Sequence, residues 1–261
     1  MPMLEIQGLS VSYGGLAAVK SMSMSADSGQ LVGLIGPNGA GKTTVLDALS
    51  GFVTAKGRIV FDGQPIDGLP PHERARRGLV RTWQSVELFD DLSVAENLQV
   101  AAERPSPFSA VRDLIRPPRP RPHALAARAL ELLQLEHLAD RMPSDLSQGQ
   151  RKLVGVARAL AGRPRILLLD EPAAGLDTDE SRQFGSRLAT LASEGIGVVL
   201  IDHDMGLVLS TCTEVHVLDF GQIIASGTPA EIRANRAVIA AYLGDEAVAA
   251  DAPAQLPGAS Q

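Results

Sequence analysis

Short runs of apolar residues mark the predicted strands of this chain. Residues 166–169 read I-L-L-L and residues 197–201 read G-V-V-L-I. Continuous apolar runs of this length are typical of strands buried on both faces, as in a parallel sheet. A third run, Leu31 to Ile35, ends at a glycine-rich turn. A helix predicted over Ser181 to Ser193 separates the first two runs.

The pattern nearer the two ends predicts short strands joined by turns. In residues 3–30 the apolar positions recur near the period of a β-strand, and the turn residues at 13–15, Y-G-G, interrupt them. Residues 57–62, G-R-I-V-F-D, read as another strand that ends in a turn. Two late runs, 215–218 and 223–224, predict a hairpin.

Amphipathic spacing predicts further helices in the middle of the chain. Residues 92–103 have Ser93 as a plausible N-cap, with Glu96 three residues later, which is the pattern of a capping box. Residues 124–138 place leucine and alanine side chains on one side. The segment after Ser147 carries a similar apolar stripe and predicts one more helix.

Two segments lack any such periodicity. Residues 116–122 read R-P-P-R-P-R-P, and proline at this density excludes a helix interior. We expect a stiff surface connector whose arginines are solvated, with a basic contact strip as the alternative. Residues 245–261 consist mainly of alanine, proline, glycine, serine and glutamine, which predicts a disordered tail.

Composition and charge limit the classes of function. The 261 residues are 45% hydrophobic, enough to bury a real core. The sequence has neither a run of 18 apolar residues nor the start of a signal peptide, and its lone cysteine, Cys212, fits a cytosolic location. The net charge of -6 argues against a broad nucleic-acid-binding face and against docking onto anionic lipid. We therefore expect a membrane role to need a protein partner in the bilayer.

The most specific motif is the glycine-rich turn G-P-N-G-A-G-K-T-T, which matches G-x-x-x-x-G-K-[ST]. Such a loop wraps polyphosphate with backbone N–H groups, and its glycines remove side chains where the loop closes in. The lysine reaches the β- and γ-phosphates, and the hydroxyl that follows holds Mg²⁺. An ordinary glycine-rich turn is the alternative. The predicted nucleotide-binding residues here are Gly36, Pro37, Asn38, Gly39, Ala40, Gly41, Lys42, Thr43 and Thr44.

A second motif, I-L-L-L-D-E-P, places two carboxylates after a buried strand. Ligands of open α/β sheets bind at the carboxyl ends of the strands. Asp170 is suited to hold Mg²⁺, directly or through water, and Glu171 to orient or deprotonate an attacking water. Taken alone, this acidic pair would equally suit the start of a helix.

The third motif is L-S-Q-G-Q at residues 146–150, where Ser147 taken alone would simply be a helix N-cap. The order of the phosphate loop, this motif, I-L-L-L-D-E-P, G-L-D and a histidine resembles an ATP-binding-cassette ATPase over roughly residues 3–244. The resemblance implies an α/β fold: a P-loop NTPase cassette with a mixed-sheet core, an N-terminal antiparallel β subdomain and an inserted helical subdomain. It implies a core over 3–88 and 162–244, with the helical subdomain over 89–161.

The resemblance also implies roles for residues that mean little alone. Tyr13 resembles the aromatic residue that stacks on adenine, with a turn or core tyrosine as the alternative. Gln84 resembles the glutamine that contacts Mg²⁺ and water, and His203 resembles the switch histidine at the γ-phosphate. In this family the counterparts of Ser147 and Gly149 bind the γ-phosphate held by the opposite subunit.

Partners follow from the same resemblance. It implies a second cassette, contacted through the loop that contains Asp177, with two ATP and two Mg²⁺ at the shared interface. It further implies transmembrane permease subunits, an extracytoplasmic substrate-binding protein, and a peripheral location on the cytoplasmic face of the membrane. No nucleic-acid partner is expected.

One residue departs from the family's usual L-S-G-G-Q, because Gln148 replaces the first glycine. The branch that imports branched-chain and other hydrophobic amino acids often varies this position, and R-T-W-Q, E-P-A-A-G-L and I-D-H-D-M also resemble that branch. An exporter ATPase for lipopolysaccharide or another lipid is the main alternative, and a cassette without a transport role is a further one. A P-loop GTPase would need an N-K-x-D motif, which the sequence lacks.

Overall fold

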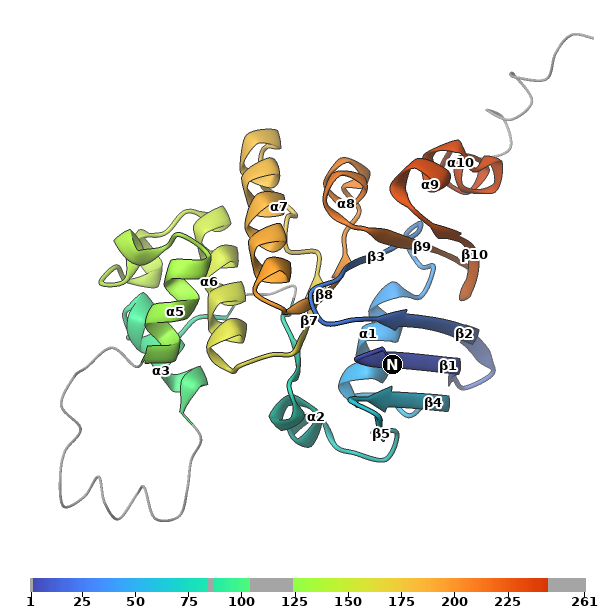
Figure 1. Ribbon diagram of the computed structural model, residues 1–261, viewed down its shortest axis with the longest axis horizontal. Coiled ribbons are helices and arrows are strands. Elements are labelled where there is room, and N and C mark those ends of the chain that lie inside the picture. The colour runs from blue at the N-terminus through green and yellow to red at the C-terminus, as the bar shows by residue number, and fades with distance from the viewer. Residues whose placement is uncertain (1, 84–86, 104–123, 244–261) are drawn as a thin grey trace, which may run out of the picture.

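The computed structural model describes residues 2–83, 87–103 and 124–243, which form two β-sheets and their flanking helices (Figure 1). The predicted connector 116–122 and the predicted tail 245–261 lie outside the described residues. The strands are β1 Leu4–Tyr13, β2 Leu16–Ala26, β3 Leu31–Ile35, β4 Lys56–Phe61, β5 Gln64–Pro65, β6 Leu79–Arg81, β7 Ile166–Asp170, β8 Gly197–Ile201, β9 Glu214–Asp219 and β10 Gln222–Gly227. The α-helices are α1 Lys42–Ser50, α2 Pro71–Arg77, α3 Val94–Ala102, α5 Ala124–Leu132, α6 Gln148–Ala161, α7 Thr178–Ser193, α8 Met205–Thr211, α9 Pro229–Ala234 and α10 Arg236–Leu243.

The larger sheet has six strands in the order β10-β9-β3-β8-β7-β6, all parallel except β10 at one edge. The predicted strands at 166–169 and 197–201 are confirmed as neighbours, β7 and β8. Successive residues along β7 alternate between two apolar clusters, one on each face of the sheet. Leu167 and Leu169 pack into one cluster, whereas Ile166 and Leu168 pack into the other. Because both faces are covered, the strand sequence is apolar throughout.

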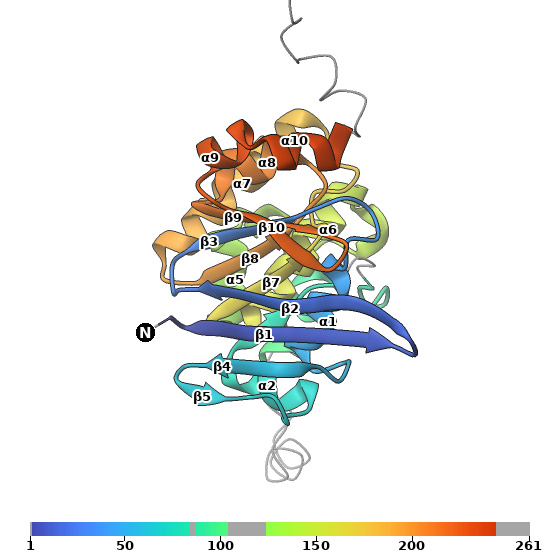
Figure 2. The same ribbon diagram turned by 90° about the vertical axis from the view of Figure 1, so that its right-hand side faces the viewer.

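The smaller sheet has four antiparallel strands in the order β2-β1-β4-β5 and packs over one face of the larger sheet (Figure 2). The predicted break at residues 13–15 is confirmed as the turn between β1 and β2, whereas the prediction of short strands was wrong, since the two strands form one long hairpin of 10 and 11 residues. Its register shifts between Ile6 and Leu9, where Gly8 has a φ of 61°, and again between Leu9 and Val11, where Ser21 on β2 has a φ of 50°. A bulge of this kind breaks the two-residue alternation without ending the strand, so the sequence pattern there reads as a break.

Most helix limits follow local capping. Ser93 and Glu96 form the predicted capping box at the start of α3, and Ser147 caps α6 as expected. The predicted helix over 124–138 was too long. The helix α5 ends at Leu132, and Gln134 takes a left-handed φ of 55° before a short 3-10 turn.

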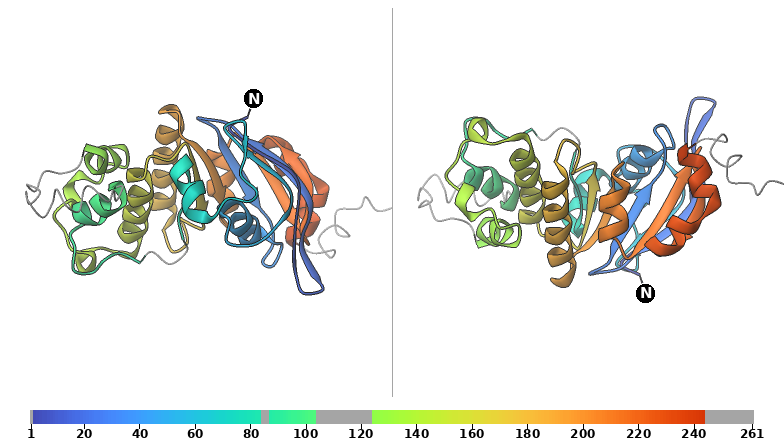
Figure 3. Two further views of the ribbon diagram at one scale, coloured as in Figure 1. Left: turned by 90° about the horizontal axis from the view of Figure 1, so that it is seen from below. Right: turned by 90° about the horizontal axis from the view of Figure 1, so that it is seen from above.

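Helices α3, α5 and α6 pack against one another and form a lobe beside α7, at the end of the molecule opposite α9 and α10 (Figures 1 and 3). This lobe carries the L-S-Q-G-Q motif at the start of α6, while the phosphate loop precedes α1 on the two-sheet body. The two motifs therefore lie on different parts of the chain's fold.

Candidate functional site

Residues 36–41 join the end of β3 to α1, whose first three residues are Lys42, Thr43 and Thr44, as the motif predicts. The glycines of this loop are required for different reasons. A Cβ at Gly36 would lie 2.0 Å from the Leu218 oxygen, and one at Gly41 would lie 2.6 Å from the Ala18 oxygen. A Cβ at Gly39 would meet nothing within 4 Å, although its φ is 82°. The loop thus packs tightly against β2 and β9 and leaves Gly39 facing outward.

Lys42 lies at the first position of α1 and is nearly buried, with 7% of its surface exposed. Its Nζ donates to the carbonyl oxygens of Gly36 and Pro37, at 2.7 and 2.9 Å. Burial lowers the pKa of Lys42, and the nearby carboxylates of Glu171 and Asp170 oppose that shift. No side chain caps the N-terminus of α1. The cation and the start of the helix therefore both suit an anion at this loop.

Asp170 is the last residue of β7 and is almost fully buried. Its Oδ2 accepts a hydrogen bond of 2.7 Å from Arg81, whereas its Oδ1 is buried and has no partner among the described residues. Burial raises the pKa of Asp170, and the hydrogen bond and charge of Arg81 act against that rise. A buried carboxylate oxygen without a partner is costly unless a ligand completes it, and Mg²⁺ prefers such oxygens. Asp170 therefore fits the metal that the motif predicts.

Glu171 follows with a φ of 47°, a left-handed conformation that is uncommon for a residue other than glycine. Strained backbone of this kind is enriched at functional sites. The Glu171 Oε2 atom lies 4.0 Å from Nδ1 of His203, which follows β8 and is exposed. The structure thus brings the predicted catalytic carboxylate and the predicted switch histidine together at one edge of the sheet.

Sequence reasoning missed Asp202, which organises the same edge from the end of β8. This residue is 1% exposed. Its carboxylate accepts from the backbone N–H groups of Ala173, at 3.1 Å, and Asp204, at 3.0 Å. It thereby ties the loop after Glu171 to the segment that carries His203. Its position directly after an apolar strand was the signal that could have found it.

The L-S-Q-G-Q motif packs against the loop that contains Asp177 in the same chain. Ser147 forms a capping box with Gln150, which explains its N-cap role by local geometry alone. A Cβ at Gly149 would lie 2.7 Å from Leu176, and one at Gly175 would lie 3.7 Å from the Gln148 side chain. Gln148, the departure from two glycines, thus lies exposed beside the Asp177 loop.

The remaining candidate residues are less closely grouped. Tyr13 ends β1 with 49% of its surface exposed, and the paired strand β2 contacts Gly41 through Ala18. Asp177 is the N-cap of α7 and accepts from the N–H groups of Asp179 and Glu180, at 2.9 and 2.8 Å. Gln84 lies outside the described residues. Of the predicted set, Lys42, Asp170, Glu171 and His203 form the group that the structure brings together.

Known proteins match nearly the whole chain. Residues 19–174 match the family profile described as ABC transporter, and residues 222–248 match the profile described as Branched-chain amino acid ATP-binding cassette transporter. The High-affinity branched-chain amino acid transport ATP-binding protein BraF of Pseudomonas aeruginosa is 43% identical over 251 residues, which cover 94% of this chain and 98% of that protein. The protein LivG of Escherichia coli, with the same description, is 40% identical over the same share of each chain.

Two further comparisons give the context. The Lipopolysaccharide export system ATP-binding protein LptB of Escherichia coli is 37% identical over 247 residues, which cover 94% of this chain and 99% of LptB. Among solved structures, MJ1267, an ATP-binding cassette of an ABC transporter, superposes with a TM-score of 0.82 at 31% identity, covering 94% of this chain and all of MJ1267.

The fold and these matches define the class of protein, an ABC transporter ATPase that binds ATP. The chain belongs to the ABC transporter family, and within it to the ATP-binding proteins of branched-chain amino acid transport. Within the described parts of the chain, no helix has the length and apolar character needed to cross a bilayer.

Proposed function

We propose that this chain powers uptake of branched-chain amino acids or related amides by hydrolysing ATP at the edge of its six-stranded sheet. The observation that carries the proposal is the convergence of Lys42, Asp170 and Glu171. The buried lysine of the phosphate loop lies close enough to both carboxylates for their charges to act on it. In the proposed site residues 36–44 hold the phosphates, and Tyr13 stacks on the adenine ring.

The metal of the proposed site is Mg²⁺, held by Thr43, Gln84 and Asp170. Thr43 is exposed beside Lys42, and Asp170 has the buried oxygen without a partner. Bound Mg²⁺ neutralises charge on the β- and γ-phosphates. Asp170 also remains hydrogen-bonded to Arg81, so its free oxygen is held in one direction.

Glu171 is the proposed general base. Its carboxylate orients the attacking water and accepts its proton, while Lys42 and His203 stabilise charge on the γ-phosphate. The backbone N–H of Glu171 donates to the Ile201 oxygen at 2.8 Å, which fixes the start of the loop at the sheet edge. Positioning of this kind supplies much of the catalysis in phosphoryl transfer.

A second cassette completes the proposed site. Ser147 is exposed at the N-terminus of the 14-residue helix α6, and Gly149 leaves the helix start free of a side chain. In the proposal this helix end, on the helical subdomain 89–161, contacts the γ-phosphate bound to the other cassette, with Asp177 at the interface. The pair is two copies of this chain or this chain with a related cassette, and it opens again after hydrolysis.

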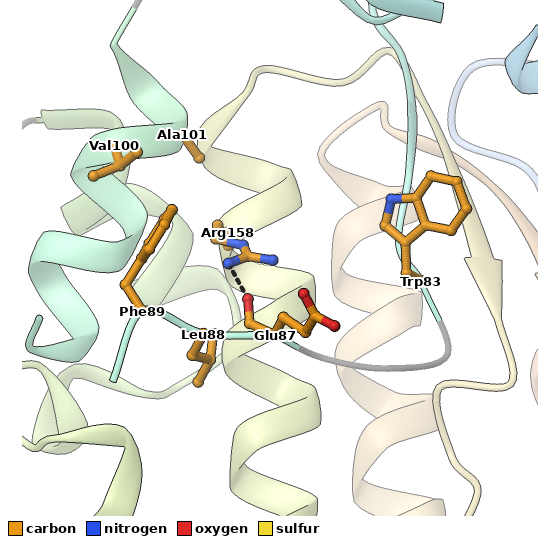
Figure 4. A pocket seen from close by; sticks show the side chains of 7 residues that line it. All are labelled: Trp83, Glu87, Leu88, Phe89, Val100, Ala101 and Arg158. Carbon is orange, nitrogen blue, oxygen red and sulfur yellow. Dashed lines mark hydrogen bonds between the residues drawn. The ribbon is translucent and has the colours of Figure 1, made fainter. Parts of the chain in front are cut away.

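A groove near the site suits the permease contact. Its lining residues are Trp83, Glu87, Leu88, Phe89, Val100, Ala101 and Arg158, and we call it the Trp83 groove (Figure 4). The Arg158 guanidinium donates to the Glu87 carbonyl oxygen at 2.6 Å and holds α6 against the segment that carries Phe89. Trp83, Phe89 and Val100 are each close to half exposed. Large apolar side chains gathered in an exposed groove are typical of a protein contact.

The cargo and the location follow from the relatives. BraF and LivG are described as branched-chain amino acid transport proteins, and they are more similar to this chain than LptB is, at 43% and 40% against 37%. The match of residues 222–248 to the branched-chain profile supports the same choice. We place the cassette on the cytoplasmic face of the membrane, bound to permease subunits that receive cargo from an extracytoplasmic binding protein.

Glu171→Gln tests the proposed chemistry. The amide keeps the size and the hydrogen-bonding reach of the side chain but cannot accept the proton. We expect steady-state ATP hydrolysis to fall by about 10²–10⁴-fold, the usual contribution of a general base. Equilibrium binding of radiolabelled ATP should remain at the wild-type level.

Glu136→Gln is the matched control, because Glu136 is exposed in a 3-10 turn remote from the P-loop in sequence. It should hydrolyse ATP at the wild-type rate. A Glu171→Gln protein that turns over ATP as fast as this control would show that Glu171 is not the base.

A further inference from the structure

Arg81 joins three elements of the fold at one point. It is the last residue of β6, and its side chain is 5% exposed. Its Nη2 donates to Asp170 Oδ2 of β7 at 2.7 Å, and its Nη1 donates to Asp47 Oδ1 of α1 at 2.5 Å. The guanidinium therefore connects the proposed metal ligand to the helix that begins at the phosphate loop.

This arrangement determines which oxygen of Asp170 is available. Oδ2 is engaged by the guanidinium, and Oδ1 is buried without a partner among the described residues. The backbone gives a second link, because Thr82 N–H donates to the Leu168 oxygen at 2.9 Å. A planar guanidinium can serve two carboxylates at once in fixed directions, whereas an ammonium group on a flexible stem does so poorly.

The same guanidinium also contacts the ring of Trp83, which lines the Trp83 groove. The Arg81 Cζ atom lies 4.4 Å from the centre of the Trp83 ring, a cation–π contact. The Trp83 ring also meets Phe52 edge to face, with 4.8 Å between the ring centres. Trp83 is 46% exposed and lines the groove. The buried Arg81 guanidinium therefore lies between Asp170, the proposed metal ligand, and the groove that we propose as the permease contact.

We propose that Arg81 is a positioning residue that holds Asp170 for Mg²⁺ and couples the metal site to Trp83 in the groove. The inference rests on the proposed role of Asp170. Mg²⁺ held by Asp170 would draw on the carboxylate that Arg81 hydrogen-bonds, and the Trp83 ring beside that guanidinium would then change its surroundings. A permease segment in the Trp83 groove would act on the same cation from its other side.

The chain contains one tryptophan, so tryptophan emission reports on the surroundings of Trp83, and the Arg81 variants show which part of the signal depends on the Arg81 contact. The experiment titrates Mg²⁺ into purified protein saturated with a non-hydrolysable ATP analogue and records tryptophan emission. Wild-type emission should change with Mg²⁺. In Arg81→Lys the half-saturating Mg²⁺ concentration should rise about tenfold, as for other residues that orient a metal ligand. The change in emission should shrink, while analogue binding in EDTA stays at the wild-type level.

Arg165→Lys is the matched control, because Arg165 also pairs with a carboxylate, Asp62, but in an exposed position. Its Mg²⁺ titration should equal that of the wild type. Asp47→Asn is the second test variant. It keeps Arg81 and its pair with Asp170. Its half-saturating Mg²⁺ concentration should lie between those of the wild type and Arg81→Lys.

Three results separate the possible failures. If Arg81→Lys and Asp47→Asn both titrate like the wild type, the inference is overturned while the metal site stands. If Asp170→Asn also titrates like the wild type, the proposed metal ligand is wrong and the inference fails with it. If Arg81→Lys does not fold, the shift in Asp47→Asn decides, and its absence overturns the inference.

Discussion

Gly39 and Gly41 belong to the same loop but are glycine for different physical reasons. Gly41 has a φ of 107°, and a Cβ there would press against the Ala18 carbonyl oxygen of β2. Gly39 also has a positive φ, but its outward side is open. Gly41 is therefore required by the fold, whereas Gly39 has the open side that the proposed nucleotide site needs.

Alanine at each position should separate these roles. Gly41→Ala should lower the free energy of unfolding by more than the 1–2 kcal/mol or so expected for left-handed alanine, because backbone must also move. Gly39→Ala should show about that strain alone, yet weaken ATP binding. Denaturant unfolding and ATP-binding titrations on both variants measure this. Equal losses of stability would contradict the assignment of Gly41 to the fold.

Contacts within one helical turn could be predicted from the sequence, whereas contacts between residues far apart in the chain could not. Capping by Ser93 and Ser147 was predictable because donor and acceptor lie within one helical turn. The contacts of Arg81 were not, since Asp47 and Asp170 lie 34 and 89 residues away along the chain. The candidate site residues were predicted from the order of their motifs, whereas the residues that hold them in place could be identified only from the structure.

At the scale of elements, the important junction lies between α6 and the loop that follows β7. Lys152, on the first turns of α6, donates to the carbonyl oxygen of Ala174 and, at 3.4 Å, to that of Glu171. Burial lowers the pKa of Lys152, and the charges of Asp202 and Glu171 oppose that shift. The helix that begins at Ser147 is thus attached to the loop that carries the proposed base.

Removing this attachment should lower both the free energy of unfolding and the rate of ATP hydrolysis. Lys152→Met keeps the length of the stem but leaves the Ala174 carbonyl oxygen without its Lys152 donor, a loss of about 1–3 kcal/mol. The Glu171 carbonyl oxygen keeps the backbone N–H of Ala174, at 3.3 Å. For a chain of this size each kcal/mol shifts the unfolding midpoint by roughly 2–4 °C. ATP hydrolysis should fall as well, because the Glu171 backbone loses a contact.

Arg182→Met serves as the comparison in thermal unfolding. Arg182 pairs with Asp179 one turn away on α7, and both side chains are more than 70% exposed, so the change should cost little. If Lys152→Met unfolds at the same temperature as Arg182→Met and retains full ATPase activity, the contact between α6 and the loop after β7 contributes to neither stability nor hydrolysis.

On the scale of the whole molecule, the two ends of the proposed site lie on separate parts of the fold. Lys42 begins α1 on the two-sheet body, whereas Ser147 precedes α6 on the helical lobe (Figures 1 and 3). Within the chain, the L-S-Q-G-Q motif packs against its own Asp177 loop, and Ser147 remains exposed. The central claim is therefore that Ser147 completes the ATP site of a neighbouring cassette.

Mixing two inactive variants tests this claim most directly. Lys42→Ala disables the phosphate loop, and Ser147→Arg blocks the helix end; each alone should lack ATPase activity while remaining folded by circular dichroism. In a mixed dimer one site keeps both Lys42 and Ser147. Random pairing should then restore about a quarter of the wild-type rate, because half of the dimers carry one intact site of two. Dimers of this chain alone are first verified by their mass in ATP. A mixture of such dimers that stays as inactive as its components would contradict a site shared between two cassettes.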